Sequence, residues 1–379
     1  MIQFIRYQIL EFHYFYLVAT ICFFNSIRFW GGGEKLHLEL AVGCKALGHH
    51  VVIACNKNGI LWQRAQEAGL ECVDVRVTKF SFLNTFHINK ISNTLASIQA
   101  NAIIFTASQD AKTGGAAAKK AGINKIVYLR GLAARVKNSY FNRRLFTKTL
   151  THIIANSEET KSLLLQKMQH VKGIPNIPVV YHGINIVETQ SRNKHPFIAQ
   201  HGNGIILGNA GRLTAQKAQK DLIDVAIKLR DLQINFTLFI AGEGEERTSL
   251  ENAIKLHQLQ DQVFLTGFVD DIPAFMQSID IFVLSSHWEG FGFVIVEAMS
   301  HELPVVAYDI SSNPEIIADN ETGLLVPCGN TDAFALAIKQ FAEDQDLCKK
   351  YGIAGRKRVI EKFEFSTQLK QLLAVIEIN

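Results

Sequence analysis

The chain is short of the residues that mark several classes of protein. It has 6 cysteines and 7 prolines among 379 residues. No two cysteines are three positions apart and no histidine pair completes a zinc-binding spacing, so no metal site is predicted. We expect buried thiols of a protein from a reducing compartment rather than disulfides. The 7 prolines and 26 glycines exclude collagen-like and low-complexity chains.

Excess charge of one sign is also small. The chain has 39 Lys and Arg against 35 Asp and Glu, and the net +4 is not gathered in one tail. This balance does not indicate a nucleic-acid partner. Hydrophobic residues make up 48% and charged residues 20% of the chain, which excludes a disordered protein. The length predicts two domains.

Long hydrophobic runs are missing as well. The apolar run YFYLVATICFF covers residues 14–24, which is shorter than the ~20 residues that a membrane helix needs. No small-residue cleavage site follows it. We expect a first buried strand over 19–25, after an atypical extension over 1–18. The alternatives for the extension are a signal anchor and a start codon placed too far upstream. The expected location is cytoplasmic, extending to the inner face of the membrane.

Short apolar runs alternate with amphipathic helical patterns along most of the chain. Apolar runs without in/out alternation are typical of strands buried on both faces, and strand–helix alternation predicts parallel sheets. The polar stretch VETQSRNKHPFIAQHGN separates two complete strand–helix series. We therefore predict an α/β fold of two Rossmann-like, doubly wound domains facing each other across a cleft. Their expected limits are 1–187 (N-terminal domain), a linker over 188–203, 204–355 (C-terminal domain), and a C-terminal helix over 356–379 that packs back across the domain interface. The strand-like runs are 21–25, 50–55, 72–77, 102–106, 125–129, 152–156, 205–210, 236–241, 263–267, 280–285, 304–308 and 323–327.

Three glycines, Gly31, Gly32 and Gly33, open the first predicted helix directly after the first strand. Glycines allow close approach of a ligand to the backbone, and the helix N-terminus offers free N–H groups. We interpret this segment as a site for a polar or anionic ligand. The alternative is a tight turn without a ligand. The spacing is not GxGxxG, so a dinucleotide fingerprint is not supported.

Two cations, Arg212 and Lys217, follow the first strand of the second half. Cations are disfavoured at a helix N-terminus, so their presence there indicates an anionic ligand such as a diphosphate. The alternative is a pair of solvated charges. Gly242 and Gly244 follow the next strand at the edge where open α/β sheets bind ligands, which is a weak signal alone.

The segment SSHWEGFGFVIVEA, residues 285–298, has the pattern strand, glycine-bearing loop, helix. Glu289 lies in the loop, and Glu297 lies one turn into an otherwise apolar helix. Such an acid is expected to be half-buried and to need a partner. The helix N-terminus can present amides to phosphate oxygens. The alternative is two acids on a solvated helix end. The loop and helix start comprise Gly290, Phe291, Gly292, Phe293 and Val294. Further along, Pro314-Glu315 is typical of a helix start. Glu315 is a further candidate site residue, and the alternative is an acid that only stabilises the first turn of its own helix.

At this point the second half resembles the retaining nucleotide-sugar glycosyltransferases of family 4, which have the GT-B fold. The matching strings, in order, are GRLTAQK, IAGEGEE, FLTGFVDDIPAFMQSIDIFVLSSHWEGFGFVIVEAM, LPVVAYDISSNPEII and ETGLLVP. They cover most of residues 205–330, and Glu289 and Glu297 match the family's pair of glutamates with seven residues between them. In the first half, WGGGEK, LGHHV and HIIANSEETKSLL also look like the family.

The resemblance implies transfer of a sugar from a nucleoside diphosphate sugar, with no cofactor and no metal. Arg212 and Lys217 would neutralise the diphosphate leaving group, and the amides of 292–294 would add to this clamp. Glu297 would hold the ribose hydroxyls, and Glu289 the donor sugar. Val269 would lie at the edge that meets the base, and residues 31–33 would face the donor from the other domain.

The sequence departs from the family pattern at three places. Ala218 stands where the family commonly has glycine after the motif lysine, and His182-Gly183-Ile184-Asn185 replaces the usual Asn-Gly-Ile-Asp. The family's first-domain histidine has no clear match, and we assign Asp110 and Arg130 to the acceptor side in its place.

We therefore predict a retaining transferase that uses front-side displacement with the leaving phosphate as base. Its partners are a nucleotide-sugar donor and a glycan or lipid-linked acceptor, as in lipopolysaccharide or other cell-surface polysaccharide synthesis. The basic and aromatic stretch 135–148 predicts peripheral contact with an anionic membrane, although a solvated face over a core stripe would look the same. The alternatives in function are a sugar-nucleotide epimerase of GT-B architecture and a non-catalytic nucleotide-sugar-binding protein.

Overall fold

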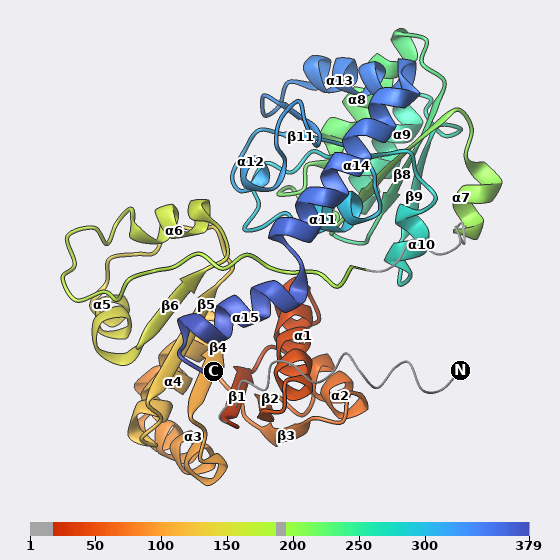
Figure 1. Cartoon of the computed structure of the whole chain (residues 1–379). Coiled ribbons are helices and arrows are strands. Elements are labelled where there is room, and N and C mark those ends of the chain that lie inside the picture. Colours follow the sequence, from red (N-terminus) through yellow and green to blue (C-terminus); the bar gives the residue numbers. More distant parts are fainter. Residues whose placement is uncertain (1–17, 187–194, 379) are drawn as a thin grey trace, which may run out of the picture.

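The computed structural model describes residues 18–186 and 195–378, which form two α/β domains (Figure 1). Each domain contains a parallel sheet of six strands, with helices on both faces. In the N-terminal domain the strand order is β3-β2-β1-β4-β5-β6, and in the C-terminal domain it is β12-β11-β10-β7-β8-β9. The strand order reverses beside β1 in one sheet and beside β7 in the other, which is the arrangement of doubly wound folds.

The elements of the N-terminal domain begin with a strand and alternate almost regularly. The strands are β1 (Thr20–Asn25), β2 (His50–Cys55), β3 (Glu71–Asp74), β4 (Ala102–Phe105), β5 (Lys125–Arg130) and β6 (His152–Ala155). The helices are α1 (Gly32–Ala46), α2 (Ile60–Glu67), α3 (Thr85–Ile98), α4 (Ser108–Lys120), α5 (Tyr140–Arg144) and α6 (Glu158–Leu165), with short turns η1 (Ser81–Leu83) and η2 (Leu145–Thr149).

The C-terminal domain repeats this plan. Its strands are β7 (Ile205–Ala210), β8 (Phe236–Ala241), β9 (Val263–Gly267), β10 (Ile281–Leu284), β11 (Val305–Tyr308) and β12 (Leu324–Val326). Its helices are α7 (Pro196–His201), α8 (Gln219–Asp231), α9 (Arg247–Leu256), α10 (Ile272–Met276), α11 (Phe293–Ser300), α12 (Asn313–Ile316), α13 (Thr331–Glu343) and α14 (Gln345–Lys362), and α15 (Phe365–Val375) ends the chain.

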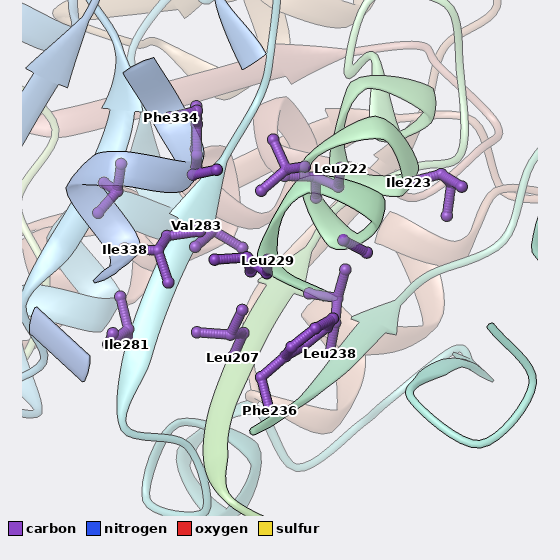
Figure 2. Packing of buried hydrophobic residues seen from close by; sticks show 14 of the residues in the cluster. Leu207, Leu222, Ile223, Leu229, Phe236, Leu238, Ile281, Val283, Phe334 and Ile338 are labelled. Carbon is purple, nitrogen blue, oxygen red and sulfur yellow. The ribbon is translucent and has the colours of Figure 1, made fainter. Parts of the chain in front are cut away.

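All twelve predicted strands are present, and the α/β doubly wound fold is confirmed. The reason is visible in the packing of the C-terminal domain: Leu207, Leu238 and Val283 from three strands meet Leu229 of α8 and Ile338 of α13 (Figure 2). Strands covered by helices on both faces need apolar side chains at consecutive positions. Among the described residues, no helix is both long and apolar enough to cross a bilayer.

The expected limits between the parts differ from the structure in two places. The linker expected over 188–203 lies outside the described residues as far as 194, and its second half forms α7, which packs on the C-terminal domain through Ile198. The limit expected at 355/356 falls inside α14. The C-terminal segment therefore consists of two helices, which are separated at Phe363 and Glu364. Ile184 forms an isolated β-bridge with Glu364 at this break.

The last helix joins the N-terminal domain. Leu369, Leu372 and Leu373 of α15 lie in the same buried cluster as Leu36 and Leu40 of α1. In Figure 1, α14 lies on the C-terminal domain, and α15 continues from it to pack beside α1. The chain thus crosses between the domains twice, once before α7 and once after α14.

Candidate functional site

Predicted site residues from both domains lie at the domain interface, although not all of them do. Gly131 follows β5 and Gly290 follows β10, and a Cβ atom built on Gly290 would lie 2.1 Å from the Gly131 carbonyl oxygen. A larger residue at 290 would push the domains apart, so this glycine permits their contact. The carboxyl ends of β5 and β10 are therefore brought together here, at the edges where open α/β sheets bind ligands.

Lys217 and Glu289 form the central pair of the C-terminal domain. The Lys217 Nζ lies 2.5 Å from Oε1 of Glu289, and the two side chains are 19% and 7% exposed. Ser285 fixes the lysine segment, because its hydroxyl donates to the carbonyl oxygens of Lys217 and Ala218 at 3.1 and 2.9 Å. A half-buried lysine held by a single carboxylate has further N–H groups to donate to an incoming anion.

Arg212 lies opposite the glycine segment of the N-terminal domain. A Cβ atom on Gly31 would lie 4.0 Å from a terminal nitrogen of Arg212, whereas Cβ atoms on Gly32 and Gly33 would meet no atom within 4 Å. No side chain caps the N-terminus of α1. The first turn of α1 therefore presents bare amides and open space beside the guanidinium.

The start of α11 supplies a second set of amides. Among the described residues, no group accepts a hydrogen bond from the N–H of Gly292 or Val294, whereas the N–H of Phe293 is bonded to the carbonyl oxygen of Phe291 at 2.8 Å. Two of the three amides predicted for a phosphate clamp are thus free. A Cβ atom on Gly292 would lie 2.7 Å from the Ile295 side chain, which explains the glycine at the helix start.

Glu297 is half-buried, as its apolar helix predicts, and its partner comes from the other domain. Lys35 Nζ of α1 lies 2.9 Å from Oε1 of Glu297, with side chains 43% and 20% exposed. The same ammonium lies 5.3 Å from the centre of the Phe293 ring. Burial opposes the charge of Lys35, but the carboxylates of Glu297 and Glu39 outweigh it and raise the pKa of Lys35.

Gly242 and Gly244 allow close packing within the C-terminal domain. A Cβ atom on Gly242 would lie 1.9 Å from the Gly211 carbonyl oxygen, and one on Gly244 would lie 2.1 Å from that of Leu213. Both glycines therefore let this loop press against the segment that carries Arg212. Val269 is buried in the core of its domain, so its side chain is not at an open edge, whereas the neighbouring Phe268 is 69% exposed.

Asp110, assigned to the acceptor side, lies buried within the N-terminal domain. Its side chain is fully buried, and its two oxygens accept from the amide and the hydroxyl of Ser26 at 2.9 and 2.6 Å. Burial raises the pKa of Asp110 to about 6, against these hydrogen bonds. Asp110 therefore holds the chain at the end of β1, and its assignment to the acceptor side stays a prediction.

Arg130 is 4% exposed and lies near the interface. Its guanidinium donates to the Tyr128 hydroxyl at 3.0 Å and to the Ala134 carbonyl oxygen at 2.8 Å, and its Nε has no partner among the described residues. With Asn156 and His182 it lines a cavity of about 30 Å³. A cavity of this size admits only a small group of an acceptor, and the acceptor role of Arg130 stays a prediction.

The contacts that join α6 to the C-terminal domain were not predicted from the sequence. Both carboxylate oxygens of Glu315 accept from the backbone amides of Glu158 and Glu159, at 2.8 and 3.0 Å. The hydroxyl of Ser157 donates to the Gly290 carbonyl oxygen at 2.9 Å. Glu315 is therefore more than a first-turn acid of its own helix. In the sequence, the segment SEE indicates the N-terminus of a helix, whose first amides need acceptors from elsewhere. It does not indicate which residue supplies them.

The segment 182–185, where the sequence departs from the family pattern, begins with a histidine that packs against aromatic rings of the C-terminal domain. The His182 ring packs against the rings of Phe291 and Phe293, with centroids 5.5 and 5.8 Å apart. Burial lowers the pKa of His182 to about 4. Within the described ranges, no three His, Cys, Asp or Glu side chains are grouped as a metal site.

Two family models match consecutive parts of the chain. The model for glycosyltransferase family 4 matches residues 30–188, and the model for glycosyl transferases group 1 matches residues 190–358. The chain belongs to the family 4 glycosyltransferases. The residues gathered at the interface come from both matched parts, so the candidate site spans the two family models.

Relatives and solved structures agree with this membership. The capsular polysaccharide biosynthesis glycosyltransferase CapM of Staphylococcus aureus is 30% identical over 162 residues, 42% of this chain and 43% of the relative. The lipopolysaccharide core biosynthesis glycosyltransferase LpsE of Rhizobium meliloti is 29% identical over 158 residues, 42% and 45% of the two chains. The chain spans about half the length of the curated relatives it matches.

Solved structures match nearly the whole chain. The glycosyltransferase of Rickettsia africae has a TM-score of 0.84 at 22% identity, covering 96% of this chain and 98% of that one. Anabaena Alr3699/HepE, in complex with UDP and glucose, has a TM-score of 0.82 at 22% identity and covers 95% and 99%. At this identity the likeness shows the fold, and it confirms the GT-B architecture of this family member.

Proposed function

We propose that the chain is a retaining glycosyltransferase that moves a sugar from a nucleoside diphosphate sugar to a hydroxyl of a glycan or lipid-linked acceptor in cell-surface polysaccharide synthesis. The observation that carries the proposal is the Lys217–Glu289 pair beside Arg212, facing the bare first turn of α1. The set combines two cations, free amides and a carboxylate. A diphosphate bearing a sugar needs these groups.

In the proposed reaction, the acceptor oxygen attacks the anomeric carbon from the side that the diphosphate leaves. The bond from the anomeric carbon to the phosphate oxygen breaks, and the leaving phosphate takes the hydroxyl proton. Arg212 and Lys217 stabilise the charge that grows on the diphosphate, so the proposal needs no metal and no cofactor. Glu289 orients Lys217 and the donor sugar, and Glu297 holds the ribose hydroxyls.

The relatives support the class of product. CapM is named for capsular polysaccharide biosynthesis and LpsE for lipopolysaccharide core biosynthesis. HepE has been crystallised with UDP and glucose. We extend these to the present chain as a proposal, together with a cytoplasmic location and an acceptor presented at the inner face of a membrane.

The test is a thermal-shift screen of nucleoside diphosphates and their sugars, followed by calorimetry. We expect the nucleoside diphosphates of one base to raise the melting temperature of the protein. Glu297→Ala should abolish that shift while leaving the unliganded protein folded. Release of free nucleoside diphosphate with acceptor glycans would support transfer. Donor alone giving a changed sugar on an intact nucleotide would support the epimerase instead, and tight binding without any release would support the non-catalytic protein.

A further inference from the structure

One stretch of the N-terminal domain carries a net charge of +12, which is more than the net +4 of the whole chain. Of the 39 Lys and Arg residues, 13 lie in residues 75–157, against 1 of the 35 Asp and Glu residues. The single acid is Asp110, which is buried and bonded to Ser26. The net charge of +4 for the whole chain conceals this segregation, because the remaining residues are acidic overall.

These cations lie on the surface and are mostly unpaired. Ten of the thirteen are exposed, and among the described residues Arg76 is the one of those ten with a carboxylate partner, Asp74. The ten are Arg76, Lys79, Lys90, Lys119, Lys120, Arg135, Lys137, Arg143, Arg144 and Lys148. They belong to α3, α4, α5 and the loops around them, which lie on the flank of the N-terminal domain turned away from the C-terminal domain (Figure 1). Such a face attracts an anionic surface.

Large apolar side chains are exposed within the same basic region. Phe80, Phe86 and Tyr140 are 65%, 79% and 63% exposed; they come from the loop before η1, from α3 and from the start of α5. Phe82 of η1 joins them to α5, because its ring packs edge-on against Phe141 at 5.0 Å. We call Phe80, Phe82, Phe86, Tyr140 and Phe141 the aromatic cluster. Lysines flank it: Lys79 lies 5.7 Å from the Phe80 ring and Lys112 lies 5.7 Å from the Phe82 ring.

We propose that the aromatic cluster and the cations around it form a docking surface for an anionic lipid bilayer. Exposed rings beside cations fit the bilayer interface, where rings enter the headgroup region and cations meet anionic lipids. Nucleic acid or an anionic polysaccharide would satisfy the charge but leaves exposed phenylalanines in water, so the rings favour the bilayer. The proposal rests on the proposed function only for its purpose, which is to bring a lipid-linked acceptor to the site.

A single loop connects this surface to the candidate site. Arg130, which lies near the interface, donates to Ala134, and the chain then runs through Arg135 and Lys137 to Tyr140 at the start of α5. Ten residues therefore link the domain interface to the aromatic cluster. A docked bilayer would lie beside the acceptor domain and leave the C-terminal domain free to exchange the donor.

The test measures co-sedimentation of the full chain with vesicles of phosphatidylcholine alone or with a quarter of phosphatidylglycerol, at about 0.1 M salt, where the Debye length is ~10 Å. We expect binding only with the anionic lipid. Replacing Lys137, Arg143 and Arg144 by Gln should lower the partition constant on the order of 100-fold, since each cation near a charged bilayer changes it about fivefold. Phe80→Ser with Phe86→Ser should also weaken binding.

Matched controls come from the C-terminal domain, where Leu256 and Leu336 are 76% and 56% exposed. Leu256→Ser with Leu336→Ser, and Lys255→Gln with Lys349→Gln, should bind vesicles as the parent does. Parent-level binding by the charge variant or by the aromatic variant would overturn the proposal. So would equal binding to both vesicles, displacement by an oligonucleotide duplex with no dependence on Phe80 and Phe86, or a dimer closed through the aromatic cluster. Nucleotide binding, measured on the same variants, reports the proposed function separately.

Discussion

The Lys217–Glu289 pair allows a quantitative test of the site. Exposed ion pairs contribute about 0–1 kcal/mol, whereas removing one partner of a buried pair costs about 3–5 kcal/mol because the other charge remains without compensation. Glu289 is 7% exposed and Lys217 is 19% exposed, so the pair lies near the buried limit. We expect Lys217→Met to cost about 3 kcal/mol, at the lower end, because the lysine keeps some contact with water.

The assay is thermal unfolding of the unliganded protein. A domain of this size loses about 2–4 °C of melting temperature per kcal/mol, which predicts a fall of about 6–12 °C. The double variant Lys217→Met/Glu289→Gln should recover most of this loss, because no charge is then left unpaired. The control is Lys228→Met, whose partner Asp332 is 76% exposed, and it should cost less than about 1 kcal/mol.

Ligand binding separates the pair's role in catalysis from its role in stability. Lys217→Met should weaken binding of the selected nucleoside diphosphate and lower turnover about 10²–10³-fold, as for loss of one group that stabilises developing charge. Glu289→Gln should bind the free diphosphate at least as tightly, because Lys217 is released, and should still lose turnover. If Lys217→Met melts at the parent temperature, or the two substitutions add without coupling, the pair does not have the role inferred here.

Three further predictions use other parts of the structure. Gly32→Ala should not lower the melting temperature, because its Cβ atom meets nothing within 4 Å, but it should weaken donor binding in calorimetry; weaker folding with unchanged binding would contradict the bare-amide interpretation. Ala218 has φ 48° in the left-handed region, so Ala218→Gly should stabilise the protein by about 1 kcal/mol in denaturant titration, whereas Ala253→Gly in the ordinary helix α9 should destabilise it by about as much. Burial lowers the pKa of His182 to about 4, so its contribution is complete above pH 6.5 and is lost as the pH falls toward 4; His182→Asn should flatten that part of the stability profile, and the exposed His170→Asn should not.

The sequence predicted the parts of the fold whose signal is local. Strands such as HVVIAC and FTLFIA are apolar at nearly every position because helices cover both faces, and they occupy β2 and β8 with the expected limits. The half-buried state of Glu297 followed from the apolar helix around it. The left-handed Ala218 lies where the family pattern has glycine, so the departure in the sequence marked a real conformational feature.

The missed features join segments that are distant in sequence. Glu315 caps α6 and Lys35 pairs with Glu297 across separations of more than 150 residues. No local sequence pattern determines how two domains meet, so these contacts between the domains could not be predicted from the sequence. The contact of Asp110 with Ser26 was not predicted for a related reason: the sequence near a strand end does not say whether a side chain points outward or back to the chain. The basic stretch 75–157 was readable, but summing charge over the whole chain concealed it.

Glu297 and Glu315 both form contacts between the domains, but only the contact of Glu297 would have to break when the donor binds as proposed. Glu297 is held by Lys35 through a partly exposed ion pair, which costs less to break than a fully buried one. If Glu297 takes the ribose hydroxyls as proposed, that tie must open when the nucleotide enters. Glu315 accepts two backbone hydrogen bonds at the start of α6, next to the Ser157 contact with Gly290. Nothing in the proposed reaction competes for those amides. The domains can therefore exchange one contact for the proposed donor while the α6 contact keeps the loop of Glu289 in place against the N-terminal domain.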